Sequence, residues 1–277
     1  MSLRINQNID AVNSYRNLSV TQGQMSKSLE KLSSGFRINR AADDAAGLAI
    51  SEGLRSQVGG LKVAVRNAQD GVSVVQTAEG ALTEVHSILQ RVRDLTVQAG
   101  NDSNNAAART NIKTEIDSLG DELTRIGAST NFNGTKLLDG SASALTFQVG
   151  ASDQASESQV VVDLSSANVG AIGTAVKALD VSSAANALTS LTTIDTNIST
   201  VSTERAKLGA SQNRFEHTIN SVNVAIENLS ASESRIRDTD MASEMMNFTR
   251  SQILSQAGTA MLAQANQAPQ SVLSLLR

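Results

Sequence analysis

The sequence predicts a mainly α-helical protein, built as a long antiparallel helical rod or coiled coil with a small β-hairpin region. Three features indicate this fold class. Proline occurs once in the 277 residues, at Pro269, so long helices are not interrupted. Aromatic residues make up 2% of the chain, which favours closely packed helices over a deep ligand pocket. Apolar residues recur at alternating steps of three and four, the heptad spacing of coiled coils.

Residues 5–34 form the first predicted helix. Its apolar positions, which follow the heptad spacing, are Leu18, Met25, Leu29 and Leu32. Gly35 marks its end, because glycine adopts the left-handed conformation that closes many helices. Asp43 and Asp44 then precede the next helix, where carboxylates stabilise the positive end of the helix dipole.

A second and much longer helix is predicted over residues 44–100, and a third follows over 112–126 and folds back antiparallel. Gly59, Gly60 and Gly71 lie inside the second helix. Each would cost about 1 kcal/mol relative to alanine at an exposed position, so we expect these glycines to allow close contact with another helix. Local flexibility is the alternative.

The periodicity changes from helical to two after the third helix. Residues 145–149 alternate between apolar and polar, and residues 160–164 are rich in β-branched side chains. We therefore expect one hairpin that turns across residues 150–158, and it is the only predicted sheet. Residues 165–190 show no clear period and are predicted as a loop.

The clearest heptad seam covers residues 191–229, and the only polar residues in its register are Arg205 and Gln212. A helix of that length spans roughly 58 Å at about 1.5 Å per residue, so it needs a partner along its apolar side. The helix over 44–100 has the same period, and we expect that helix of the same molecule to be the partner. Residues 230–233 match a capping box and predict a break before the last helix.

Composition and charge argue against several classes of function. The net charge is −4 with both signs mixed along the chain, so nucleic acid is not an expected partner. No apolar stretch is long enough for membrane insertion, and no Sec-type signal peptide is expected. Cysteine is absent, and His86 and His217 are far apart in the sequence. We therefore expect no metal site, no cofactor and no catalytic site.

Four segments resemble bacterial flagellin, the subunit of the flagellar filament. They are residues 32–51, which are similar to the N-terminal signature of that family, and residues 131–138, 235–242 and 269–277. The segments reach both ends of the chain, so the resemblance is specific. It implies a structural protein, not an enzyme, that self-assembles into a helical homopolymer for motility. The alternative is a hook–filament junction protein of the same family.

The resemblance also implies an arrangement of domains. Residues 1–42 and 231–277 would pair as the N- and C-terminal halves of an inner coiled-coil core domain. Residues 43–230 would form the helical rod domain, with its hairpin near 145–164. Family members leave the cell unfolded by flagellar type III export, and their ends fold on polymerisation in the extracellular filament. The expected partners are the export chaperone, the filament cap and the hook–filament junction proteins.

Polymer contacts are expected at apolar residues of the two ends, because residues 257–277 are unusually apolar for a chain end. The predicted polymerisation interface consists of Leu18, Met25, Leu29, Leu32, Ile253, Met261, Leu262, Leu273 and Leu276. The alternative is that these residues form an intramolecular core, since pairing of the two ends would bury some of them without a neighbour.

The resemblance implies one recognition site as well. Residues 89–95, with Glu115 on the next helix, are similar to the patch that the animal Toll-like flagellin receptor recognises, so Arg91, Leu95 and Glu115 are the expected contacts. The compatible alternative is that this surface packs between subunits. An enzyme embedded in the filament is a third hypothesis, but residues 131–180 contain no histidine and are too short for a catalytic insert.

Overall fold

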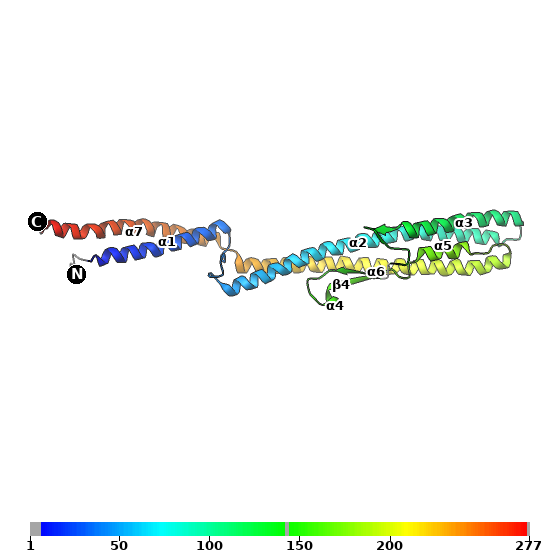
Figure 1. Cartoon of the computed structure of the whole chain (residues 1–277), viewed down its shortest axis with the longest axis horizontal. Helices are drawn as coiled ribbons and strands as arrows, with labels where there is room; N and C mark the ends of the chain where they lie inside the picture. The colour runs from blue at the N-terminus through cyan, green and yellow to red at the C-terminus, as the bar shows by residue number, and fades with distance from the viewer. Residues whose placement is uncertain (1–6, 142–143, 276–277) are drawn as a thin grey trace. The chain divides into compact units, whose positions relative to one another are not determined.

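The chain forms long helices and a few short strands in the computed structural model, which describes residues 7–141 and 144–275, with side chains through residue 267. The helices are α1 (Ile9–Ser34), α2 (Ala45–Ala99), α3 (Ala106–Ser129), α4 (Ala155–Ser158), α5 (Val169–Lys177), α6 (Ala184–Arg237) and α7 (Met241–Leu275) (Figure 1). The strands are β1 (Asn131–Phe132), β2 (Thr135–Lys136), β3 (Ala144–Gln148) and β4 (Gln159–Asp163). The predicted fold class is confirmed.

The chain divides into two compact units. The first comprises the residues before 57 and after 227, and we call it the terminal unit; the second is Gln57–Glu227, and we call it the rod unit. Helices α2 and α6 contribute residues to both units. The domain limits at residues 42 and 230, which the resemblance implies, stay a prediction.

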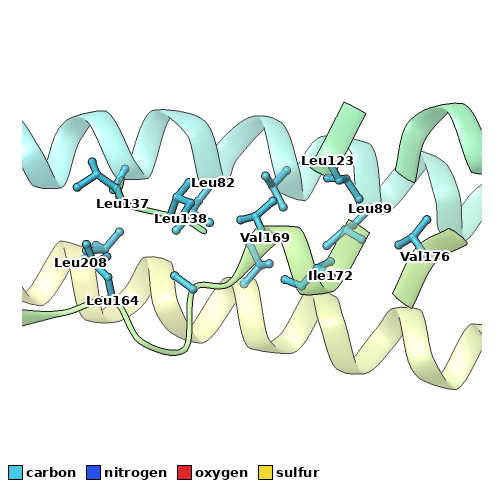
Figure 2. Packing of buried hydrophobic residues seen from close by; sticks show 14 of the residues in the cluster. Leu82, Leu89, Leu123, Leu137, Leu138, Leu164, Val169, Ile172, Val176 and Leu208 are labelled. Carbon is cyan, nitrogen blue, oxygen red and sulfur yellow. The ribbon is translucent and has the colours of Figure 1, made fainter. Parts of the chain in front are cut away.

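The core of the rod unit lies where α2, α3 and α6 pack against one another. Helix α6 runs antiparallel to α2, with Arg93 Nε of α2 2.8 Å from Asp195 Oδ1 of α6. Figure 2 shows Leu82 and Leu89 of α2 and Leu208 of α6 in one apolar cluster, together with side chains from the segments between the helices. The seam of α6 therefore finds its partners within the same chain, as its period predicted.

The glycines of α2 differ in what surrounds them. A Cβ on Gly71 would lie 2.7 Å from Cζ of Phe215, and a Cβ on Gly60 would lie 3.0 Å from Cβ of Ala151. The expectation of close contact with another helix is confirmed at Gly71, because Phe215 belongs to α6, whereas Gly60 meets the loop between β3 and β4. It is wrong at Gly59, where a Cβ would meet nothing within 4 Å.

Two antiparallel strand pairs replace the single predicted sheet. Strands β3 and β4 form the expected hairpin, with Leu145 paired to Val162, and α4 lies within its connection. Strands β1 and β2 form a second, two-residue hairpin. Its turn residues Asn133 and Gly134 have φ values of 47° and 84°, the left-handed conformation that an Asn-Gly hairpin turn requires. The prediction of a single sheet is therefore wrong.

The predicted loop over 165–190 contains helix α5 and the first turns of α6, so that prediction is wrong. Asn168 begins α5, because its Oδ1 accepts a hydrogen bond from the Ala171 amide at 2.9 Å. Val169 and Ile172 then point into the core from one side of the helix (Figure 2). Packing against α3 and the core stabilises a segment whose composition alone indicates a loop.

Helix α6 continues through the predicted break at 230–233 and ends at Arg237. That stretch contains neither glycine nor proline, so nothing in it stops a helix. The chain breaks at residues 238–240 instead, and Asp240 Oδ1, just before α7, accepts hydrogen bonds from the amides of Ala242 at 2.9 Å and Ser243 at 3.1 Å. Asp240 is thus the N-cap of α7, and the capping-box prediction is wrong.

In the terminal unit, α1 and α7 lie side by side and antiparallel (Figure 1). Asn8 Nδ2 donates to the Ala265 carbonyl at 2.7 Å near one end of the pair. At the other end, the Arg37 amide donates to the Arg237 carbonyl at 2.6 Å, and the Thr239 amide donates to the Gly35 carbonyl at 3.0 Å. These bonds tie the break after α1 to the break before α7.

Candidate assembly surface

The seam between α1 and α7 consists mostly of small or polar residues. Its non-exposed positions repeat in steps of three and four, as in a coiled coil. The positions of α1 that keep this spacing are Ala11, Ser14, Leu18, Thr21, Met25, Ser28 and Leu32, and those of α7 are Glu244, Phe248, Ser251, Ser255, Gly258, Leu262 and Ala265. Five of these fourteen residues are large and apolar, and the other nine are small or polar.

Most of the large apolar residues of the two helices lie outside this seam and are exposed. Those that are at least half exposed are Ile9, Val12, Tyr15, Val20 and Leu29 on α1, and Met241, Met245, Met246, Ile253, Leu254 and Met261 on α7. An apolar groove along α7 is lined by Ala242, Met245, Met246, Thr249, Arg250, Ile253 and Leu254. More large apolar residues of the pair are therefore exposed than lie in the seam, and a contiguous apolar surface such as the α7 groove is typical of an interaction site.

The predicted interface residues divide between these two environments. Leu18, Met25, Leu32 and Leu262 are partly buried in the seam, which agrees with the intramolecular alternative for these four residues. Three others are exposed, namely Leu29 at 56%, Ile253 at 60% and Met261 at 63%. For Leu273 only the backbone is described, in α7, and Leu276 lies outside the described residues.

Sequence reasoning missed part of the exposed surface, including Val12, Tyr15, Met245 and Leu254. The reason is that each terminal helix carries two apolar patterns, one facing its partner helix and one facing outward. Reading a single heptad through the helix mixes the two. A search for a second apolar stripe, out of phase with the first, would have found these residues.

The predicted receptor contacts do not share one environment. Arg91 on α2 donates from Nε and Nη2 to Glu115 Oε1 on α3, at 2.9 and 2.7 Å, and the two side chains are 56% and 45% exposed. Leu95 is 2% exposed and belongs to the core of the rod unit. Its side chain offers no surface to a partner in this conformation, because it packs beneath the helix face that carries Arg91.

Polar contacts hold the link between α1 and α2 next to the assembly surface. Asp43 Oδ2 accepts hydrogen bonds from the amides of Arg40 at 3.0 Å and Asn39 at 3.2 Å. These bonds lower the pKa of Asp43 from its ordinary value of 3.8. Arg40 also pairs with Glu30 of α1 at 2.8 Å. The carboxylate of Asp43 therefore stays ionised at neutral pH and fixes the turn that leads into α2.

The described residues contain no cluster of three or more acidic, histidine or cysteine side chains arranged to bind a metal ion. Over the same part of the chain, no helix is both long enough and apolar enough to cross a membrane.

Comparison with known families matches the two helical ends of the chain to one family. Residues 5–143 match the model of the bacterial flagellin N-terminal helical region, and residues 191–276 match that of the bacterial flagellin C-terminal helical region. The chain belongs to the bacterial flagellin family. It is 52% identical to flagellin of Halalkalibacterium halodurans over 99% of each chain, and 50% identical to flagellin of Bacillus subtilis over 99% of this chain and 100% of that one.

A further relative carries the filament in its name. The chain is 44% identical to the flagellar filament 33 kDa core protein of Treponema phagedenis, over 99% of each chain. As a full-length relative of flagellins, this chain is a structural subunit of the bacterial flagellar filament, a polymer of many copies. No finding favours the hook–filament junction protein of the same family.

Proposed function

We propose that the terminal unit joins neighbouring copies of this flagellin in the filament, through the exposed apolar faces of α1 and α7. The observation that carries this proposal is that eleven large apolar residues of the described pair are at least half exposed, while five lie in the seam. We further propose that these helices reach stable packing only on assembly.

The free energies of residue ordering and of apolar burial support coupling between folding and assembly. Ordering one residue costs roughly 1 to 2 kcal/mol, while burial of apolar surface returns about 25 cal/mol per Å². Much of the seam is small or polar, as at Ser14, Thr21, Ser251 and Gly258, so we propose that apolar burial within one chain does not offset the whole of that cost. A neighbouring copy that covers the outer faces supplies the missing burial.

The same surface gives a reason for the other proposed partners. We propose that the chain leaves the cell by flagellar type III export and functions outside it. In this proposal the export chaperone, the filament cap and the hook–filament junction proteins cover apolar terminal helices, either before assembly or at the ends of the polymer. Membership of the flagellin family supports this route.

The assembly proposal is tested by Ile253→Gln in the full chain. Ile253 is 60% exposed, so the change leaves the α1–α7 seam intact and removes apolar area only from the outer face. Burial of one isoleucine side chain stabilises a contact between two copies by about 1.5–3 kcal/mol. Without it we expect elongation from filament seeds to slow by roughly tenfold or more. The control Gln256→Ala changes an exposed polar residue on the same helix and should elongate normally. Normal elongation of Ile253→Gln would show that this face does not form the polymer contact.

The exposed Arg91–Glu115 pair favours a second function. We propose that the free chain is recognised by the animal Toll-like flagellin receptor at this pair, with Leu95 supporting α2 from beneath. Arg91→Ala should weaken receptor signalling by about tenfold in a reporter assay, because arginine is frequent among residues that dominate binding energy. Arg125→Ala is the matched control, since Arg125 forms a similar exposed pair with Glu122 on α3. Equal signalling by Arg91→Ala and the parent would exclude Arg91.

A further inference from the structure

The sulfur chemistry of this chain is concentrated on one helix. The sequence has no cysteine and six methionines, and four of the six are Met241, Met245, Met246 and Met261 of α7. These four are 50%, 54%, 66% and 63% exposed. Met25, by contrast, is partly buried in the seam on α1. An oxidant that meets the chain therefore finds no thiol, and among the described residues the exposed thioether sulfur atoms are those of α7.

Met245 and Met246 lie in the apolar groove of α7, next to Ile253 and Leu254. Methionine suits such a surface, because its unbranched, polarisable side chain adapts to irregular apolar neighbours. Oxidation to the sulfoxide changes this side chain into a polar and chiral one and disrupts methionine-rich interfaces. The two residues thus combine accessibility in the free chain with a place in the proposed contact between copies.

We propose that Met245 and Met246 form an oxidation-sensitive site that controls assembly of this flagellin. A peroxide oxidises them in the free chain, and the sulfoxides prevent this face of α7 from packing against a second copy. With hydrogen peroxide, the sulfur lone pair attacks one oxygen and the O–O bond breaks, and the proton of the attacked oxygen passes to the other oxygen, which leaves as water. Sulfur is oxidised and the peroxide is reduced. The inference rests on the proposed assembly role of α7.

The expected difference between the free and the assembled chain follows from the same contact. In the filament a neighbouring copy covers the groove, so the two sulfur atoms become inaccessible. At one dose of hydrogen peroxide, we expect peptide mapping by mass spectrometry to find at least fivefold less sulfoxide at Met245 and Met246 in filaments than in free chains. Equal oxidation of these residues in both forms would overturn the proposal.

The functional test compares three full-length chains before and after treatment with hydrogen peroxide: the parent, the double variant Met245→Leu/Met246→Leu, and Met25→Leu. Leucine conserves volume and apolar character and is not oxidised. Oxidised parent and oxidised Met25→Leu should elongate from seeds at least tenfold more slowly than before treatment, while the oxidised double variant keeps its rate. Equal loss in the double variant, or no loss in the parent, would overturn the proposal.

A second measurement keeps the proposal testable if the double variant assembles poorly without peroxide. Methionine sulfoxide reductase should return the oxidised parent to its original elongation rate, since the chemistry is reversible. Failure of this rescue, with the sulfoxides shown to be removed, would contradict the inference. If Ile253→Gln stalls while the fully oxidised parent elongates normally, only the oxidation site is refuted. If Ile253→Gln also elongates normally, the proposed assembly surface itself is refuted.

Discussion

At the scale of single residues, the rod unit depends on one position where a side chain is absent. Phe215 of α6 is completely buried and meets Phe147 of β3 edge to face, with ring centroids 5.5 Å apart. The same ring occupies the space that a Cβ on Gly71 of α2 would need. An aromatic ring so enclosed cannot move aside without disturbing its neighbours. Gly71 therefore sets the distance between α2 and α6 at this level of the core.

Gly71→Ala should destabilise the rod unit. Overpacking costs typically about 1–3 kcal/mol, and the better helix propensity of alanine returns only about 1 kcal/mol of this. Gly59→Ala is the matched control, because a Cβ there meets nothing within 4 Å, so this variant should be stabilised by up to about 1 kcal/mol. Urea unfolding followed by circular dichroism measures both. A midpoint for Gly71→Ala at or above that of Gly59→Ala would contradict the packing described.

At the scale of elements, the sequence predicted the long helices and the β3–β4 hairpin well, because each has a period that runs over many residues. It did not predict α5, which has nine residues and too few turns to show a period. Tertiary packing stabilises α5: Gly173 lies so close to α3 that a Cβ there would be 2.5 Å from Thr124 Oγ1. The amino-acid composition of this segment does not predict such a contact. The break predicted at residues 230–233 is wrong because a capping-box pattern also occurs inside helices.

Gly173→Ala should loosen α5 from α3. The new Cβ would also lie 2.8 Å from the Gly120 carbonyl oxygen, and backbone cannot give way as a flexible side chain does. We expect the substitution to lower the local stability of α5 by about 1.4 kcal/mol or more, so amide hydrogens of Val169–Lys177 should exchange roughly tenfold faster. The control is Gly170→Ala, whose Cβ would only reach Asn168 Oδ1 at 3.4 Å. Equal protection of α5 in the two variants would show that α5 does not depend on this close approach.

At the scale of the whole molecule, the two units bury apolar residues in opposite ways. The rod unit has a continuous core of leucine, isoleucine and valine from α2, α3, α5, α6 and the hairpin. The terminal unit has a seam made mostly of small and polar residues, and most of its large apolar residues are exposed. The first pattern is complete within one chain, and we propose that neighbouring copies complete the second. Binding of other copies would then add stability to the terminal unit.

The candidate site was predictable in location but not in detail. The apolar character of both chain ends indicates a contact region, and Leu29 and Ile253 of the predicted interface are exposed, whereas Leu18 from the same spacing lies in the seam. Which side of each helix faces its partner depends on how α1 and α7 pair. The pairing brings together residues far apart in the sequence, such as Asn8 and Ala265, so the spacing within one helix does not predict it. The role of these residues in polymer contact stays a prediction.

Amide hydrogen exchange in the free chain and in the filament is the measurement that tests the central claim most directly. If α1 and α7 pack stably only on assembly, amides of Ile9–Ser34 and of residues 241–267 should exchange quickly in the free chain, while the rod-unit parts of α2 and α6 are protected. In the filament, protection of α1 and α7 should rise by at least about a hundredfold, which corresponds to about 2.7 kcal/mol. Equal protection of α1 and α7 in the free chain and in the filament would contradict the account.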